Sequence, residues 1–297
     1  MVAATANIVL SDTPNVGDLK TLNGKTSGSI KIDNGAVTYT DSAVNLAAAL
    51  DGTITDGSGN ALSGNMVLNT DPNATQLQTI NNGTTGNVII PNAGITLSGT
   101  PAVLVEALTG SVATAGNAKI SGTVTITTTN PDSAQLKTIN DAIDGAIVVP
   151  DKTVQLSGTA TALAAALTGT VTDSANAKIE GNVTITGANP TEAELKTIND
   201  GTTATIIVPD KTVQLSSTAD VLAAALTGTV TDSSSDKITG NVTITDTPTE
   251  TELQTINNGT TASIQIPAAN QTFTAAADVL AEALTGTVTG PGAAALS

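Results

Sequence analysis

The chain has 297 residues, its 26 acidic residues outweigh 10 lysines to give a net charge of −16, and it contains no Cys, His, Trp or Arg. Without them it lacks the commonest general base, the thiolate nucleophile, the nitrogen and sulfur metal ligands and the bidentate guanidinium that binds phosphate. Negative charge and only two aromatic residues, Tyr39 and Phe273, also argue against nucleic-acid binding.

The sequence repeats itself five times with a nearly constant period. Two sets of leucines recur at intervals of 58 or 59 residues: Leu19, Leu77, Leu136, Leu195 and Leu253, and Leu50, Leu108, Leu167, Leu226 and Leu284. A fixed period of this kind is typical of repeat architectures, whose units cover one another's apolar faces. We therefore predict repeats over residues 1–64, 65–122, 123–181, 182–240 and 241–297.

The first half of the fourth repeat predicts a strand followed by a helix. Residues 182–186 alternate β-branched apolar residues with Thr, which is typical of a half-buried strand. Thr191 and Glu194 then form a capping box at a helix start. The matching pairs in the other repeats are Asn15 with Asp18, Asn73 with Gln76, Asp132 with Gln135, and Thr249 with Glu252. We expect this helix to end at residues 199–201, with Gly201 in the left-handed conformation.

The second half of the repeat predicts two further strands and a second helix. β-Branched runs stand on both sides of a turn at residues 209–211. A helix then begins near Ser217 or Thr218, is rich in Ala and stops at Gly228, whose counterparts are Gly52, Gly110, Gly169 and Gly286. A last short strand leads into the polar loop at 232–236. Each repeat thus consists of two β-α-β halves.

This order of elements fits two architectures. The first is an α/β solenoid of five units of about 59 residues, with short strands and short helices. The second is a tandem array of small ferredoxin-like units, which share the same element order. An isolated unit of this size with almost no aromatics buries little apolar surface, and no linker separates the repeats. The sequence therefore favours the solenoid.

The acidic loops are the candidate binding sites. Asp56, Ser58 and Asn60 are spaced like the first oxygen ligands of a calcium loop. Asp173, Asp232 and Asp236 are the corresponding candidates in later repeats. The glutamate that completes such a loop is missing, so a turn without metal is the competing interpretation. We expect no cofactor, with calcium at these loops as the one alternative.

Pairs of carboxylates provide a second candidate for chemistry. Glu192 with Glu194, and Glu250 with Glu252, could be read as acid/base pairs. All four stand in the first turn of a predicted helix, where the helix dipole favours negative charge. We therefore expect structural roles for them.

Two segments resemble tandem repeats of large bacterial, often cyanobacterial, surface proteins and of some phage fibre proteins. They are VTITDTPTETELQTINNGTTASIQI (242–266) and TADVLAAALTGTVT (218–231). The resemblance covers nearly the whole chain and rests on a bias toward Thr, Asn, Asp, Gly and Ala. It implies an extended extracellular or virion stalk, and it supplies no catalytic residues.

Together these features predict a non-enzymatic structural protein that forms a fibre, spacer or filament subunit. The alternative is an adhesin module that binds calcium or another surface partner through the acidic loops. We expect location outside the cell, on its surface or in a virion, with no signal peptide and no membrane-inserted segment in the sequence given. The expected partners are copies of the chain itself, joined end to end through exposed apolar surface and strand edges.

Overall fold

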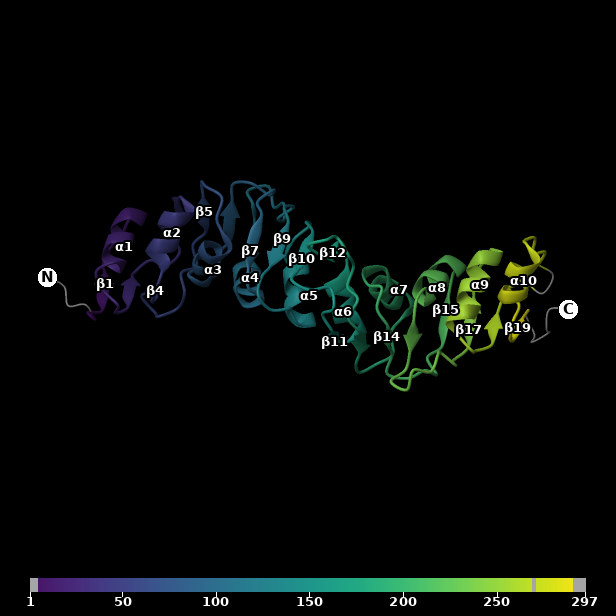
Figure 1. Ribbon diagram of the computed structural model, residues 1–297. Coiled ribbons are helices and arrows are strands. Elements are labelled where there is room, and N and C mark those ends of the chain that lie inside the picture. The colour runs from purple at the N-terminus through teal and green to yellow at the C-terminus, as the bar shows by residue number, and fades with distance from the viewer. Residues whose placement is uncertain (1–4, 269–270, 291–297) are drawn as a thin grey trace. The chain divides into compact units, whose positions relative to one another are not determined.

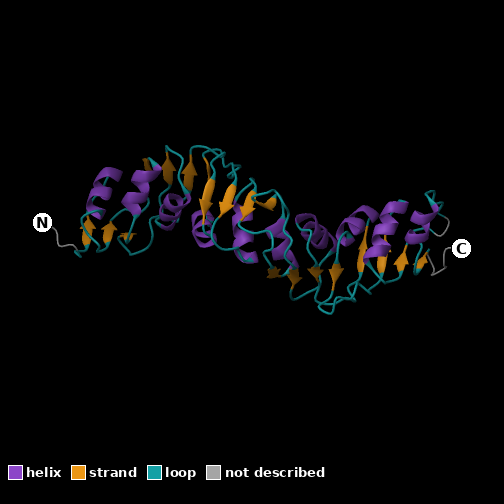
Figure 2. Ribbon diagram, viewed as in Figure 1, coloured by secondary structure: helices purple, strands orange, loops and turns teal. Residues whose placement is uncertain are grey.

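The computed structural model describes residues 5–268 and 271–290, in which short helices and short strands alternate (Figure 1; Figure 2). The helices of these residues are α1 (Val16–Asn23), α2 (Ala43–Leu50), α3 (Ala74–Asn82), α4 (Pro101–Leu108), α5 (Ser133–Ala142), α6 (Ala160–Leu167), α7 (Glu192–Gly201), α8 (Ala219–Leu226), α9 (Glu250–Gly259) and α10 (Ala277–Ala283). The α/β class predicted from the sequence is confirmed.

Each strand has two or three residues. They are β1 (Ile8–Leu10), β2 (Ile30–Ile32), β3 (Tyr39–Asp41), β4 (Ile54–Asp56), β5 (Met66–Leu68), β6 (Val88–Ile90), β7 (Leu97–Gly99), β8 (Val112–Thr114), β9 (Val124–Ile126), β10 (Ile147–Val149), β11 (Leu156–Gly158), β12 (Val171–Asp173), β13 (Val183–Ile185), β14 (Ile206–Ile207), β15 (Leu215–Ser217), β16 (Val230–Thr231), β17 (Val242–Ile244), β18 (Ile264–Gln265) and β19 (Val288–Thr289). The fourth repeat therefore follows the predicted order.

By internal packing the chain divides into two compact units. One comprises the described residues up to Pro131 together with Thr138–Pro150, and the other comprises Asp132–Lys137 and the described residues from Asp151 onward. The first unit contains the sheets β1-β2-β4 and β3-β5-β6-β8 and the strands β7, β9 and β10 of a third. The second unit contains β11-β13-β14-β16 and β15-β17-β18-β19. The sheets are parallel.

The sheets do not coincide with the sequence repeats. In the fourth repeat β13, β14 and β16 belong to one sheet, whereas β15 pairs with β17 of the fifth repeat. The fourth strand of the β13 sheet is β11, which comes from the third repeat. The strands β3 and β7 cross to the next repeat in the same way. A self-contained array would complete each sheet within one repeat, and these sheets are not completed in that way.

The core lies between the sheets and the helices. Aligned strand residues such as Val183, Ile206 and Val230 are almost fully buried. Leu195 of α7 and Leu222 of α8 have no exposed surface either. Burying a side chain of this size contributes about 1.5–3 kcal/mol. The leucines that set the predicted period, such as Leu195, are therefore core residues.

The two glycines that end the helices of a repeat have different roles. The helix α8 ends at Leu226, close to the stop predicted at Gly228, and Gly228 and its four counterparts have positive φ, with +86° at Gly228. The expectation for Gly201 is wrong, because Gly201 does not have positive φ and is the last residue of α7. A Cβ added there would lie 2.7 Å from the Leu167 Cβ of α6. Gly201 is therefore explained by the close approach of two helices.

Candidate functional site

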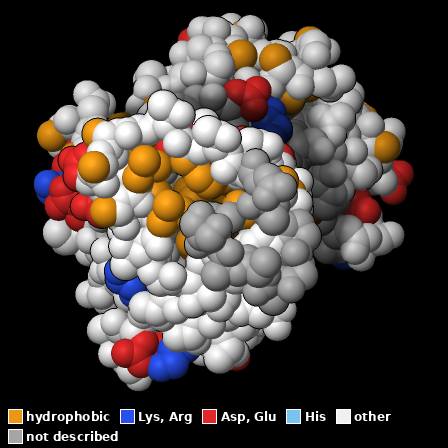
Figure 3. All heavy atoms as spheres, turned by 90° about the vertical axis from the view of Figure 1, so that its right-hand side faces the viewer, with side chains coloured by type: hydrophobic (Ala, Val, Ile, Leu, Met, Phe, Trp, Pro, Cys, Tyr) orange, Lys and Arg blue, Asp and Glu red, His pale blue; other side chains and the backbone are white. Residues whose placement is uncertain are grey.

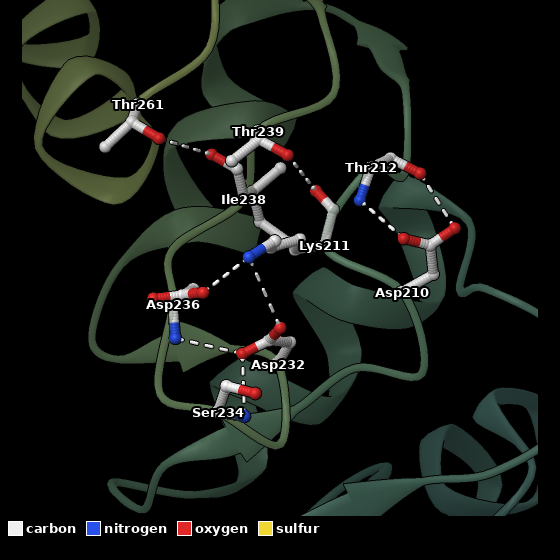
Figure 4. Close-up of polar contacts among 9 residues, drawn as sticks. All are labelled: Asp210, Lys211, Thr212, Asp232, Ser234, Asp236, Ile238, Thr239 and Thr261. Atoms are coloured by element: carbon white, nitrogen blue, oxygen red, sulfur yellow. Dashed lines mark hydrogen bonds and ion pairs between the residues drawn. The ribbon is translucent and has the colours of Figure 1, made fainter.

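The acidic loop of the fourth repeat is a tight turn held by the Asp232 carboxylate. Its Oδ1 accepts hydrogen bonds from the Ser234 amide at 2.8 Å and the Asp236 amide at 2.9 Å (Figure 4). Ser235 has φ +68°, and its amide donates to the Asp232 carbonyl. The first aspartate of the loop thus satisfies the backbone of its own turn, as Asp side chains commonly do.

A lysine from the preceding turn lies against this loop. Lys211 Nζ lies 3.8 Å from Asp232 Oδ2 and donates to Asp236 Oδ2 (Figure 4). The hydrogen bond to Asp236 is the main reason that the pKa of Lys211 is raised. Its ammonium occupies the space where a cation bound to both carboxylates would sit. A metal ion would therefore have to displace Lys211 in the fourth repeat.

The other candidate residues form the same turn with different neighbours. Asp173 Oδ1 accepts from two backbone amides of its turn, at 2.8 and 2.9 Å. Lys152, which corresponds to Lys211, pairs with Glu180 at 2.8 Å, and this pair raises the pKa of Lys152. Each turn carries at most two of the predicted carboxylates.

The first loop has no lysine. Asp56 Oδ1 accepts from the amides of Ser58 and Asn60 at 2.9 and 2.8 Å, and the bond from Asn60 is the main cause of its lowered pKa. Gly35 stands where the fourth repeat has Lys211. The structure thus brings the three predicted ligands Asp56, Ser58 and Asn60 into one turn. Within residues 5–268 and 271–290, no cluster of three or more Asp or Glu side chains suits a metal ion. Calcium binding stays a prediction.

The paired glutamates bond with the backbone. Glu194 closes the capping box with Thr191 and accepts a hydrogen bond from Thr161 of α6 at 2.6 Å. Glu192 accepts from the amide of Ser216 in β15, and Glu250 accepts from the Thr274 amide at 2.5 Å. These contacts agree with the structural role expected for the glutamates.

Sequence reasoning missed two recurring polar contacts at the C-terminal ends of helices. The side-chain amide of Asn199, near the end of α7, donates to the Ala224 carbonyl of α8 at 2.7 Å and to the Thr227 carbonyl. Asn23, Asn81 and Asn257 make corresponding bonds. Lys178 Nζ donates to the Asp200 carbonyl at the end of α7. Both contacts satisfy carbonyls at helix C-termini. The recurrence of Asn at one position in all five repeats was the available signal.

Shallow grooves recur beside these contacts. In the fourth repeat a groove of about 370 Å³ is lined by Lys178, Asn199, Thr202 and Thr227, among others. Grooves of about 480 and 580 Å³ lie at the matching positions of the first and fifth repeats. Each groove is lined by an asparagine that bonds to a carbonyl of the following helix: Asn199, Asn23 and Asn257 respectively. The grooves thus repeat with the fold.

Comparisons with known proteins gave no matches: no family model, curated protein or solved structure resembles this chain closely enough to be assigned as a relative. Among the helices of the described residues, none has the length and apolar character needed to cross a bilayer.

Proposed function

We propose that this chain is a non-enzymatic structural protein: an α/β solenoid of five repeats that serves as a fibre, spacer or filament subunit outside the cell or in a virion. The observation that carries the proposal is the sharing of strands between repeats. Because β11 completes the sheet of the fourth repeat and β15 completes the sheet of the fifth, each repeat depends on its neighbour. Such coupling is the nearest-neighbour design of solenoid proteins.

The repetition of the polar clusters supports a structural role over catalysis. An enzyme needs one site whose residues differ from the rest. In this chain the acidic turns, the asparagine contacts and the grooves recur from repeat to repeat. The acidic side chains at helix starts bond with the backbone that they cap.

Fragments of the fourth repeat test the solenoid. Residues 182–240 contain β13, β14 and β16 but lack β11, whereas residues 155–240 contain all four strands of the sheet. We expect circular dichroism to show an unfolded chain for the shorter fragment and a cooperative thermal transition for the longer one. A cooperative transition of residues 182–240 alone would contradict the proposal.

Association of the chain with itself is part of the proposal. Light scattering behind size exclusion should show a mass that rises with concentration above the 29.2 kDa of one chain. Electron micrographs of the same samples should show fibres, because an open head-to-tail contact propagates. A constant monomer mass at all concentrations would remove self-association from the proposed function and leave the spacer role.

The second candidate function is an adhesin module that binds calcium. The observation that favours it is the first loop, where Gly35 stands in place of Lys211. Calcium should then raise the melting temperature of the wild type. Asp56→Ala should abolish the increase, whereas Asp232→Ala, in the loop blocked by Lys211, should preserve it. No increase with the wild type would exclude this candidate.

A further inference from the structure

The first sheet has one strand fewer than its counterparts in the described residues. It consists of β1, β2 and β4, whereas the next sheet contains β3 as well as three strands of this kind. The strand that corresponds to β3 would pair with β1, as Tyr39 pairs with Met66. On that side β1 is unpaired within the residues that the structure describes. Val9 in its middle is 75% exposed.

The fifth repeat contains a segment that corresponds in sequence to the missing strand. Residues 273–275 stand where the fourth repeat has β15, and Phe273 corresponds to Leu215. They pair with no sheet. Phe273 is partly exposed, whereas Leu215 is 1% exposed.

This segment is already held in the position of a strand. The Thr274 amide donates to Glu250 Oε1, just as the amide of Ser216 donates to Glu192 Oε1. In β15 these bonds lie on the side that faces away from β17, and the other side pairs with β17. The corresponding side of residues 273–275 is thus prepared to pair with another strand.

The junction between the fourth and fifth repeats shows what such pairing looks like. Leu215 aligns with Val242, and the Leu215 amide donates to the Asn241 carbonyl at 3.1 Å. The Thr245 amide donates to the Ser217 carbonyl at 2.9 Å. The chain therefore contains a template for adding this strand to the edge of the next sheet.

We propose that residues 273–275 of one copy add as a parallel strand to β1 of a second copy. Phe273 would align with Ile8, and the Phe273 amide would donate a hydrogen bond to the Asn7 carbonyl. The Ser11 amide would donate to the Ala275 carbonyl. Addition of a strand to an exposed edge is a common mode of recognition between chains. The inference rests on the self-association in the proposed function and specifies its contact.

The helix that follows the segment presents the apolar surface that this contact needs. Figure 3 views the end of the second unit at which α10 lies and shows hydrophobic side chains gathered there. Leu284, just after α10, is 39% exposed, whereas its counterpart Leu226 is 2% exposed beneath α9. In the joined copies α10 would cover α1 as α8 covers α9.

One residue weakens this contact relative to the internal junctions. Gly259 lies against Leu226, and a Cβ there would come within 2.7 Å of the Leu226 Cβ. The corresponding residue of the first repeat is Lys25. In the proposed contact a Cβ at position 25 would meet Leu284 of the neighbouring copy, so Lys25→Gly should tighten association several-fold. Each copy also carries a net charge of −16, so added salt should favour association.

Engineered disulfides test the register in the full chain, which has no cysteine of its own. Neighbouring strands lie about 4.8 Å apart, within the range that a disulfide spans. Val9→Cys with Thr274→Cys should give covalently linked multimers under oxidising conditions. Ser216→Cys with Thr243→Cys, the aligned pair of β15 and β17, should give a disulfide within one chain and so serves as the control for geometry.

A second experiment tests whether a charge at Phe273 weakens the association between copies. Phe273→Asp should lower the association constant at least tenfold, whereas Thr251→Asp, an exposed residue of α9, adds the same charge and should not. Two results together would overturn this contact and leave the proposed function standing: multimers that persist in Phe273→Asp, and no disulfide between positions 9 and 274 in the double cysteine variant. A wild-type chain that stays monomeric would overturn both this contact and the proposed self-association.

Discussion

Two nearly identical helices of this chain have opposite surroundings. The helix α8 reads ADVLAAAL and ends at Leu226, and α10 with its next residue reads ADVLAEAL up to Leu284. Leu226 is 2% exposed and Leu284 is 39% exposed. The difference is that α8 packs between α7 and α9, whereas among the described residues α10 packs against α9 alone. Burial in this architecture is thus decided by the neighbouring repeat.

The largest expected effect separates the two leucines. Leu226→Ala should lower the free energy of unfolding by about 2–5 kcal/mol, because it removes a buried side chain and leaves a cavity. Leu284→Ala should cost less than about 1 kcal/mol, since much of that side chain already contacts water. Urea denaturation of both variants measures the difference. Equal losses would show that α10 is covered as α8 is.

A glycine tests the close approach that buries α8. Gly259→Ala should destabilise the chain by about 1–3 kcal/mol, because the new Cβ would overlap Leu226 of the preceding helix. Lys25 occupies the same position in the first repeat. Lys25→Ala should therefore stay within about 0.5 kcal/mol, as for other surface changes. A neutral Gly259→Ala would contradict the close packing of α8 and α9.

These comparisons also show what the sequence can and cannot predict. The capping box at Thr191 and the helix stop at Gly228 follow from patterns within one repeat, and both were predicted. The partner of β15 was not, because its short apolar run looks the same whichever sheet it joins. The role of Gly201 was mistaken for the same reason, since the Leu167 that explains it belongs to the preceding repeat.

The candidate site shows the same limit. The spacing of Asp56, Ser58 and Asn60 correctly placed them in one turn. It did not show that the carboxylate would accept two backbone amides of that turn. Lys211 escaped notice because it stands 21 residues before Asp232 in the sequence and reaches it only after folding.

The asparagines at the helix ends offer a smaller contrast. Asn199 caps α8 through two carbonyls in a partly buried setting, and Asn257 bonds to the Glu282 carbonyl of α10 in an exposed one. Asn199→Ala should cost about 1 kcal/mol, since the partly buried Ala224 carbonyl loses its donor. Asn257→Ala should cost about half of that or less, because water replaces the amide. Thermal melts of both variants provide the measurement, and the reverse order would contradict the contrast.

The smallest effect concerns pH at the contact between α6 and α7. The hydrogen bond from Thr161 is the main cause of the lowered pKa of Glu194. Because the pKa is lower in the folded state, this carboxylate stabilises the fold above its unfolded pKa, about 4.3. The contribution is lost as the pH falls through the folded value.

Glu194→Gln isolates this effect. The variant should be less stable than the wild type by about 0.5 kcal/mol at pH 7, the size typical of exposed polar pairs. The difference should shrink below about pH 4, where the wild-type carboxylate gains a proton. Thr161→Val should flatten the same pH dependence, because it removes the donor that lowers the pKa. A stability that depends on pH in Thr161→Val as it does in the wild type would contradict the contact between α6 and α7.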